Sequence, residues 1–209
     1  QTMVPDWQKR HLMHQSMSET RNPKVPSTII ELLSHHNYYD MTFGLDPKFK
    51  FIASRAIYKG MLRFIHQTTG TPYVVQPLPV QQMNISYANN DSLHISWAER
   101  VDRLEPTATP TYYIIYTRTS QLRDGQWQTS DWDNGIRVTT PHATLPIQRG
   151  VKYDIMVRAG NDGGVSLPSE VLSAYIDAKY DNKLTLIING FHRVDAPEMF
   201  GIDSITGGV

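Results

Sequence analysis

The segment Leu93-His94-Ile95-Ser96-Trp97 alternates strictly between apolar and polar residues. Alternation with a period of two places its three apolar side chains on one face of a β-strand, which is expected to be buried. Residues 112–118 and 153–159 are rich in β-branched and aromatic residues and predict two further strands. Turn-forming pairs such as Asp124-Gly125 separate these segments. The middle of the chain therefore predicts an all-β domain.

About 100 residues with roughly seven short strands are typical of an immunoglobulin-like β-sandwich. Residues 93–97, 113–116, 143–159 and 161–169 together resemble a fibronectin type III domain, which would occupy residues 72–178. The resemblance implies a buried Trp97 in the sandwich core. It also implies that Tyr153 forms a tyrosine corner, with its hydroxyl returning to upstream backbone. Trp127 and Trp132 lie in the 121–135 excursion between strands, where exposed rings would be available to a glycan.

Residues 1–71 have a different pattern. Pro26 to Glu31 contains a β-branched run that predicts a short buried strand, and residues 34–46 are rich in turn formers. A helix is expected over residues 47–66, with Asp46 as its N-cap and proline at its first position. The periodicity places apolar side chains on one face and assigns a solvated face to five cations. These are Lys48, Lys50, Arg55, Lys59 and Arg63.

Residues 1–71 resemble the C-terminal end of zinc-dependent N-acetylmuramoyl-L-alanine amidases, an α/β fold. The resemblance rests on residues 26–31, on Ser34-His35-His36-Asn37 and on residues 54–60, although Leu32-Leu33 replaces the family's Gly-Phe. It implies that Glu31 is the general base of the parent enzyme, accepting a proton from a zinc-bound water. The alternative is a structural carboxylate at a strand end.

The zinc ligands of that family come from sequence upstream of the final strand, and residues 1–25 contain no counterpart. His11 and His14 are three residues apart and His35 and His36 are adjacent, but such spacings are common on solvated surfaces. No metal site is therefore predicted in this chain, and zinc is expected only in the parent enzyme. The chain alone is expected to be inactive.

Residues 179–209 begin with a buried strand near residues 184–190 and are predicted to be the first strand of a further, incomplete domain. The fold class is thus mixed: a fibronectin type III-like sandwich plus a partial α/β amidase-like segment. This order of parts resembles multidomain envelope proteins of Gram-negative bacteria, some catalogued as xanthan lyases. The resemblance implies an extracytoplasmic location in the periplasm or at the cell surface.

The amino-acid composition limits the classes of binding partner that this chain can have. The 209 residues carry 20 basic and 20 acidic side chains and no cysteine, which excludes disulfides and thiolate metal sites. A neutral chain lacks the basic excess typical of nucleic-acid binding, and no apolar run is long enough to span a bilayer. The expected partner is peptidoglycan or another cell-surface glycan. The parent would hydrolyse the peptidoglycan amide, with the sandwich as spacer or docking surface; the alternative is a non-catalytic glycan- or protein-binding module, or an accessory part of a lyase.

Overall fold

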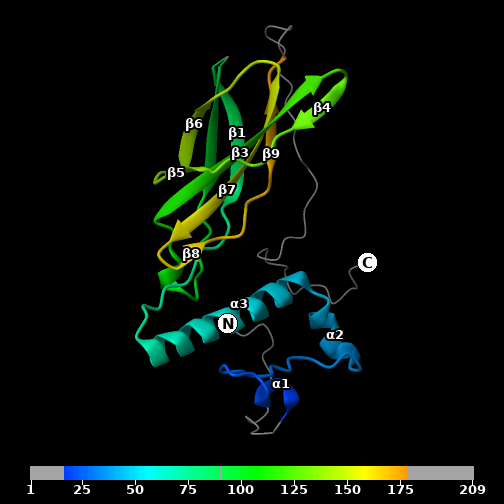
Figure 1. The fold of residues 1–209 in the computed structure, drawn as a ribbon, viewed down its shortest axis with the longest axis vertical. Helices are drawn as coiled ribbons and strands as arrows, with labels where there is room; N and C mark the ends of the chain where they lie inside the picture. The colour runs from blue at the N-terminus through cyan, green and yellow to red at the C-terminus, as the bar shows by residue number, and fades with distance from the viewer. Residues whose placement is uncertain (1–16, 90, 178–209) are drawn as a thin grey trace. The chain divides into compact units, whose positions relative to one another are not determined.

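A computed structural model of the chain describes residues 17–89 and 91–177 (Figure 1). The chain divides into two compact units. One comprises Gln1–Ile52 with Val194–Val209, and the other comprises Ala53–Arg193. The predicted third part, 179–209, and the pair His11 and His14 lie outside the described residues.

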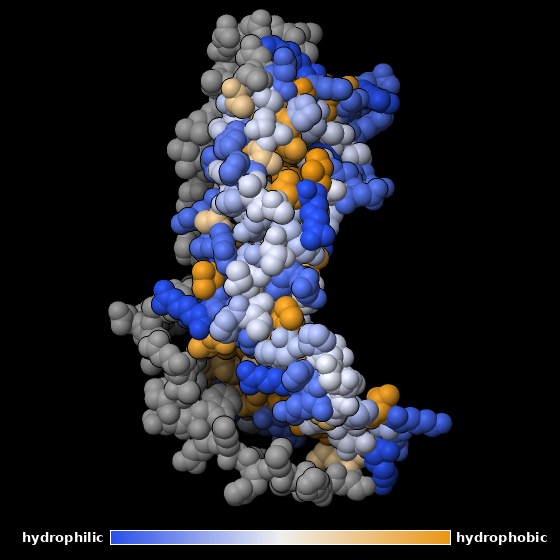
Figure 2. All heavy atoms as spheres, turned by 90° about the vertical axis from the view of Figure 1, so that its left-hand side faces the viewer, coloured by the Kyte–Doolittle hydropathy of each residue, from blue (hydrophilic) through white to orange (hydrophobic). Residues whose placement is uncertain are grey.

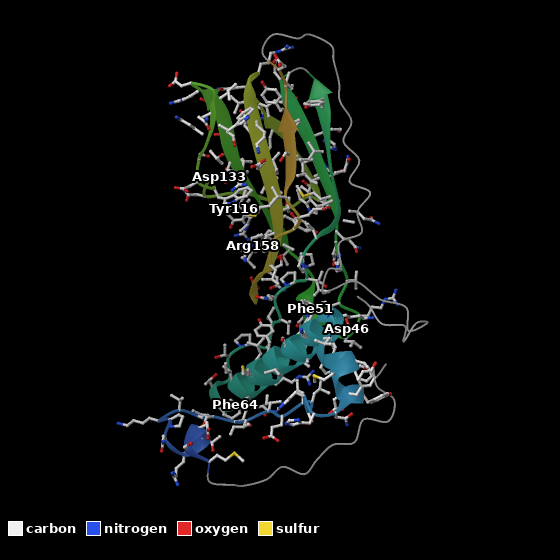
Figure 3. The ribbon with its side chains drawn as sticks, turned by 90° about the vertical axis from the view of Figure 1, so that its right-hand side faces the viewer. Asp46, Phe51, Phe64, Tyr116, Asp133 and Arg158 are labelled. Carbon is white, nitrogen blue, oxygen red and sulfur yellow. The ribbon has the colours of Figure 1, made fainter. Side chains whose placement is uncertain are left out.

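The second unit contains two antiparallel sheets. Its strands are β1 (Gln81–Asn89), β2 (Ser92–Ala98), β3 (Tyr112–Arg123), β4 (Gln126–Thr129), β5 (Ile136–Val138), β6 (His142–Pro146), β7 (Val151–Asn161), β8 (Gly164–Val165) and β9 (Leu172–Tyr175). The smaller sheet has the order β1-β2-β6. In the larger sheet the order is β4-β3-β7-β8, with β5 also pairing with β3 and β9 also pairing with β7. Figures 1 and 3 show the larger sheet lying over the smaller one, so the predicted β-sandwich is confirmed.

The core lies between the inward faces of the two sheets. Strand β2 alternates as predicted, and Leu93, Ile95 and Trp97 are buried in it. The Trp97 ring meets Tyr113 of β3 edge-on, with the ring centroids 5.3 Å apart. The rest of the buried cluster is apolar and comes from both sheets and from residues next to their strands: Val80, Met83, Ile115, Leu145, Ile147, Ile155, Val157, Ala159 and Ala174. This alternation leaves every second side chain of β3 and β7 on the outer face of the larger sheet.

Tyr153 forms the predicted corner. The backbone N–H of Gln148, five residues upstream, donates to the Tyr153 hydroxyl oxygen at 3.0 Å. The ring of Tyr153 packs against the buried cluster. The hydrogen bond therefore ties the turn before β7 to the core.

The excursion expected at residues 121–135 is largely a hairpin. Strand β3 continues to Arg123 and turns into β4 through Asp124 and Gly125, which have φ angles of 51° and 77°. Two successive positive φ values are the mark of the tight turns that match the twist of paired strands. The Asp124-Gly125 turn signal was thus sufficient for a hairpin, and the interpretation as an excursion was wrong.

The first unit has helices rather than the predicted strand. Helix α1 covers Ser18–Arg21 and α2 covers Tyr38–Gly44, where the Asn37 side chain caps the helix by accepting from Tyr39 N and Asp40 N. Residues 26–31 form no strand, and Ile29, Ile30 and Glu31 are exposed. The buried strand predicted there is wrong, because a β-branched run forms a strand only when a neighbouring strand pairs with it.

Helix α3 (Pro47–Thr69) begins where predicted, with the Asp46 carboxylate accepting from Lys48 N at 2.8 Å. Its expected solvated face is solvated only at Lys50 and Arg63. Lys48 is buried, and the side chains of Arg55 and Lys59 are only 11% and 15% exposed. The expected apolar face contributes several exposed side chains instead, among them Met61 and Phe64, the latter labelled in Figure 3. For Arg55 and Lys59 the physical reason is a pair of carboxylates after β2, described below.

Candidate functional site

The outer face of the larger sheet carries aromatic and cationic side chains close together. Antiparallel pairing places Arg118 opposite Asp154, and Lys152 between Ser120 and Tyr175. We call Arg118, Lys152, Trp127, Trp132 and Tyr175 the aromatic–cationic face. Arg118 comes from β3, Lys152 from β7 and Tyr175 from β9. Trp127 comes from β4, and Trp132 from the loop after β4. The face is therefore assembled from segments that are distant in sequence.

Trp127 is the most exposed of the three rings, at 51%. Its indole meets the Tyr175 ring edge-on, with the centroids 5.9 Å apart and the planes at 83°. Trp127 pairs with Leu122 across the hairpin, and both side chains are exposed. Contact with Tyr175 positions the indole while its surface stays open, which is the condition for stacking an apolar ligand face.

A buried carboxylate organises the two cations. Asp154 is 2% exposed and accepts from Arg118 Nε at 2.9 Å, Lys152 Nζ at 3.1 Å and Ser173 Oγ at 2.6 Å. Burial alone would raise the pKa of Asp154, but the hydrogen bonds from Ser173, Lys152 and Arg118 outweigh it, so the pKa lies below its ordinary value. Asp154 is therefore ionised at neutral pH, and the cluster of two cations and one anion keeps a net positive charge.

Two neighbours, Asp154 and Trp132, orient the Arg118 side chain. Its guanidinium carbon lies 4.8 Å from the centroid of the Trp132 ring, a cation–π arrangement. Within the described residues, Nε is the only nitrogen of this guanidinium that donates a hydrogen bond. The terminal nitrogens are therefore available to a ligand, since the side chain is 38% exposed.

The same face continues along β3 toward the other end of the sheet. Arg137 of β5 and Arg158 of β7 both lie opposite Ile114 of β3. The Arg137 guanidinium stacks at 3.6 Å from the Tyr112 ring centroid, whereas Arg158 Nε donates to the Ser166 carbonyl at 2.7 Å. Figure 3 shows Arg158 on the same side of the sandwich as Tyr116, which lies between these arginines and Arg118. The outer face thus carries cations at two positions along β3, near Ile114 and near Arg118.

The reverse side of the β3–β4 hairpin holds a shallow polar hollow of about 310 Å³. Hydroxyl, amide and guanidinium groups line it, from Thr119, Gln121, Arg123, Gln128, Thr129 and Ser130. The two sides of the hairpin therefore differ: one is polar and concave, and the other exposes Trp127. Figure 2, which views the molecule from the left of Figure 1, shows hydrophobic side chains only in small separate groups on that side of the sandwich.

The second polar cluster holds the C-terminal part of α3, within Ala53–Arg193. Asp102 Oδ2 accepts from Arg55 Nε at 2.8 Å and from Lys59 Nζ at 3.1 Å. Glu105 Oε2 accepts from the Tyr73 hydroxyl at 2.7 Å and lies 4.0 Å from Lys59 Nζ. Each polar group of this cluster has a partner inside the protein, so it serves as a structural link and leaves little for a ligand to bind.

Burial and hydrogen bonding act in opposite directions on these carboxyl groups. Burial alone would raise the pKa of Asp102, but hydrogen bonds from Arg55 and Lys59 hold it below its ordinary value. The pKa of Glu105 is also lowered, because hydrogen bonds from Tyr73 and Thr107 outweigh burial. Burial and the Glu105 partner raise the pKa of Tyr73. The carboxylates are thus charged at neutral pH, which explains why Arg55 and Lys59 of α3 point toward them.

The residues singled out for amidase chemistry do not come together. Glu31 is exposed in the segment before α2, and the adjacent rings of His35 and His36 lie 3.9 Å apart in an exposed turn. Among the described residues, no group of three or more His, Asp or Glu side chains is arranged to hold a metal ion. The role of Glu31 in a parent enzyme stays a prediction. No helix of the described part of the chain is long and apolar enough to cross a membrane.

The sequence indicated part of the aromatic–cationic face. Trp127 and Trp132 were identified as candidates, whereas Arg118, Lys152 and Tyr175 were not. The alternation of β3 places Arg118 on the face opposite Tyr113 and Ile115, so its outward position was available as a signal. No local signal places Lys152 and Tyr175 beside it, because their positions depend on pairing between β3, β7 and β9.

No protein-family model and no curated protein matches this sequence. Solved structures similar to it include the twitchin kinase region from C. elegans (20% identity, TM-score 0.40), which covers 52% of this chain and 18% of that one. The match to domains d3–d4 of the rat CD45 extracellular region has 16% identity and a TM-score of 0.37, and it covers 48% of this chain and 50% of that one. The match to a human fourth fibronectin type III domain has 20% identity and a TM-score of 0.37, and it covers 52% of this chain and 85% of that one. This chain thus spans about half or less of the first two. The assignment of its middle part as an antiparallel sandwich rests on its own strand pairing.

Proposed function

We propose that this chain is a non-catalytic, glycan-binding part of an extracytoplasmic multidomain protein of the bacterial cell envelope. The fibronectin type III-like sandwich serves as its docking module, and peptidoglycan or another cell-surface glycan is the partner. The observation that carries the proposal is the half-exposed Trp127 indole, held edge-on by Tyr175 on a sheet face. Amide hydrolysis by a parent zinc enzyme remains a separate prediction that depends on Glu31.

The chemistry of the face suits a sugar polymer. The C–H faces of pyranose rings stack on exposed aromatic rings, and side-chain hydrogen-bond donors beside the rings pair with the sugar oxygens. Trp127 and Tyr175 supply the rings, and Arg118 and Lys152 supply the donors. A sheet face is also rigid, so the protein loses little conformational entropy when an extended polymer binds to it.

Co-sedimentation of the full chain with insoluble peptidoglycan, together with affinity electrophoresis in gels containing soluble polysaccharides, tests this proposal. We expect retardation by at least one glycan and a loss of about tenfold in affinity for Trp127→Ala, since a stacked ring contributes on the order of that factor. Gln128→Ala is the matched control, because it changes the next residue of β4 on the other side of the hairpin. Equal loss in both variants, or no retardation of the wild-type chain by any glycan, would contradict the proposal.

A further inference from the structure

The two cations beside the stacking rings point to a charged ligand. Arg118 and Lys152 have side chains 38% and 37% exposed, so both reach solvent while Asp154 fixes their positions from below. A neutral sugar needs no such pair, because hydroxyl and amide groups are sufficient to bind its oxygens. Asp154 compensates one of the two positive charges, and a bound anion would compensate the other.

The shape of the cationic groups favours a carboxylate. A guanidinium presents parallel N–H donors in a planar fork that matches the two oxygens of a carboxylate, and such bonds are stronger than those between neutral groups. Stacking on Trp132 fixes the plane of the Arg118 fork. Its bond to Asp154 uses only Nε, so the two terminal nitrogens remain for the ligand.

The cations also continue in the direction that a polymer would follow. Arg137 and Arg158 lie on the same outer face, four residues along β3 from Arg118. Four residues of a strand span about 13 Å. A polymer with a carboxylate on successive sugars would therefore meet cations at both positions. The chain as a whole is neutral, so this local charge, rather than a general attraction to polyanions, selects the ligand.

We infer that the aromatic–cationic face binds an anionic polysaccharide, whose carboxylates pair with Arg118 and Lys152 while its sugar rings stack on Trp127 and Tyr175. This inference rests on the proposed function and narrows its ligand to uronate-type glycans. An acidic protein segment would use the cations but would not require the exposed rings.

The probe is polygalacturonate, compared with the same polymer after full methyl esterification, which removes the charge and keeps the sugar backbone. For the full chain we expect affinity about tenfold higher for the charged form, weakening as salt is added. Lys152→Gln should lower this affinity, and Arg118→Lys, which keeps the charge beside Asp154 but removes the planar fork, should lower it too. Both variants should weaken binding of the charged polymer more than that of the esterified polymer, in which the same side chains contact only neutral sugar oxygens. Thermal melting identifies any variant that fails to fold.

Lys50→Gln is the matched control, because it makes the same change in net charge at an exposed position of α3. An equal loss for Lys50→Gln would overturn the inference, since binding would then follow net charge. Equal binding of the charged and esterified polymers would also overturn it, while leaving glycan binding intact. Competition by polyglutamate as strong as that by polygalacturonate would show that a peptide suffices. Absence of binding to every glycan would overturn the proposed function itself.

Discussion

Arg55 Nε lies 2.8 Å from Asp102 Oδ2, and this ion pair links helix α3 to the loop that follows β2. Lys59, one helical turn later, donates to the same carboxylate oxygen at 3.1 Å. Arg55 also donates through Nη2 to the Gln76 carbonyl at 3.1 Å, on the segment that joins α3 to β1. Two cations at i and i+4 thus converge on one acidic side chain, because residues four apart lie on the same face of a helix.

Replacing Asp102 by Asn should destabilise the unit formed by Ala53–Arg193. The change leaves two largely buried cations without their carboxylate, and we expect a loss of about 2 kcal/mol in the free energy of unfolding. Urea denaturation of the full chain followed by tryptophan fluorescence measures it. Asp131→Asn removes an exposed carboxylate and serves as the control. A midpoint for Asp102→Asn equal to that of the control would mean that the ion pair does not hold the helix.

Acidification should weaken the same unit. Asp102, Glu105 and Asp154 have lowered pKa values in the folded protein, since hydrogen bonds outweigh the effect of burial. A lowered folded pKa means that the stabilisation is present above the ordinary values of about 3.9 for Asp and 4.3 for Glu. It is lost as the pH falls through the folded values, which lie below them. Urea midpoints should therefore decline most steeply below about pH 4.

The Asp154→Asn variant provides the comparison for this pH dependence. It lacks one of the three titrating groups, so its stability should be lower at neutral pH and should decline less on acidification. Parallel curves for the variant and the wild-type chain would show that Asp154 does not contribute.

Trp97→Ala should unfold the sandwich. Trp97 is 6% exposed and packs on Tyr113, and truncating a large buried aromatic residue costs about 3–5 kcal/mol. Loss of the β-sheet signal in circular dichroism, or a greatly lowered melting temperature, is the expected readout. Trp127→Ala removes the same side chain from an exposed site and should melt like the wild type. If Trp97→Ala also melted like the wild type, the assignment of the core would be wrong.

Tyr153→Phe isolates the hydroxyl of the tyrosine corner. The ring would keep its packing, but the Gln148 N–H would lose its acceptor, at a cost of about 1 kcal/mol. Tyr39→Phe, at an exposed position of α2, controls for the loss of a phenolic hydroxyl. A chemical-denaturation midpoint shifted only for Tyr153→Phe is the expected result, and a shift of zero would contradict a stabilising corner.

Local pattern was sufficient for much of the fold. The alternation of apolar and polar residues identified strand β2 and predicted that Trp97 is buried in it. The pair Asp46-Pro47 marked the start of α3. These features depend on neighbours a few residues away in sequence, such as the Lys48 N–H that Asp46 accepts from. The candidate site could be predicted in part, because Trp127 follows the local turn signal Asp124-Gly125, whereas its exposure depends on the tertiary structure.

The sequence by itself determined strand β2 and the start of α3, since period and capping act over one or two turns. Only the tertiary structure decided which face of α3 is covered, because Asp102 lies 47 residues from Arg55 and its charge outweighs the apolar periodicity. Tertiary pairing also decided that residues 26–31 form no strand, for want of a partner, and that Tyr175 and Lys152 stand beside Trp127 and Arg118. Burial and register are properties of contacts between distant segments, so no local pattern contains them.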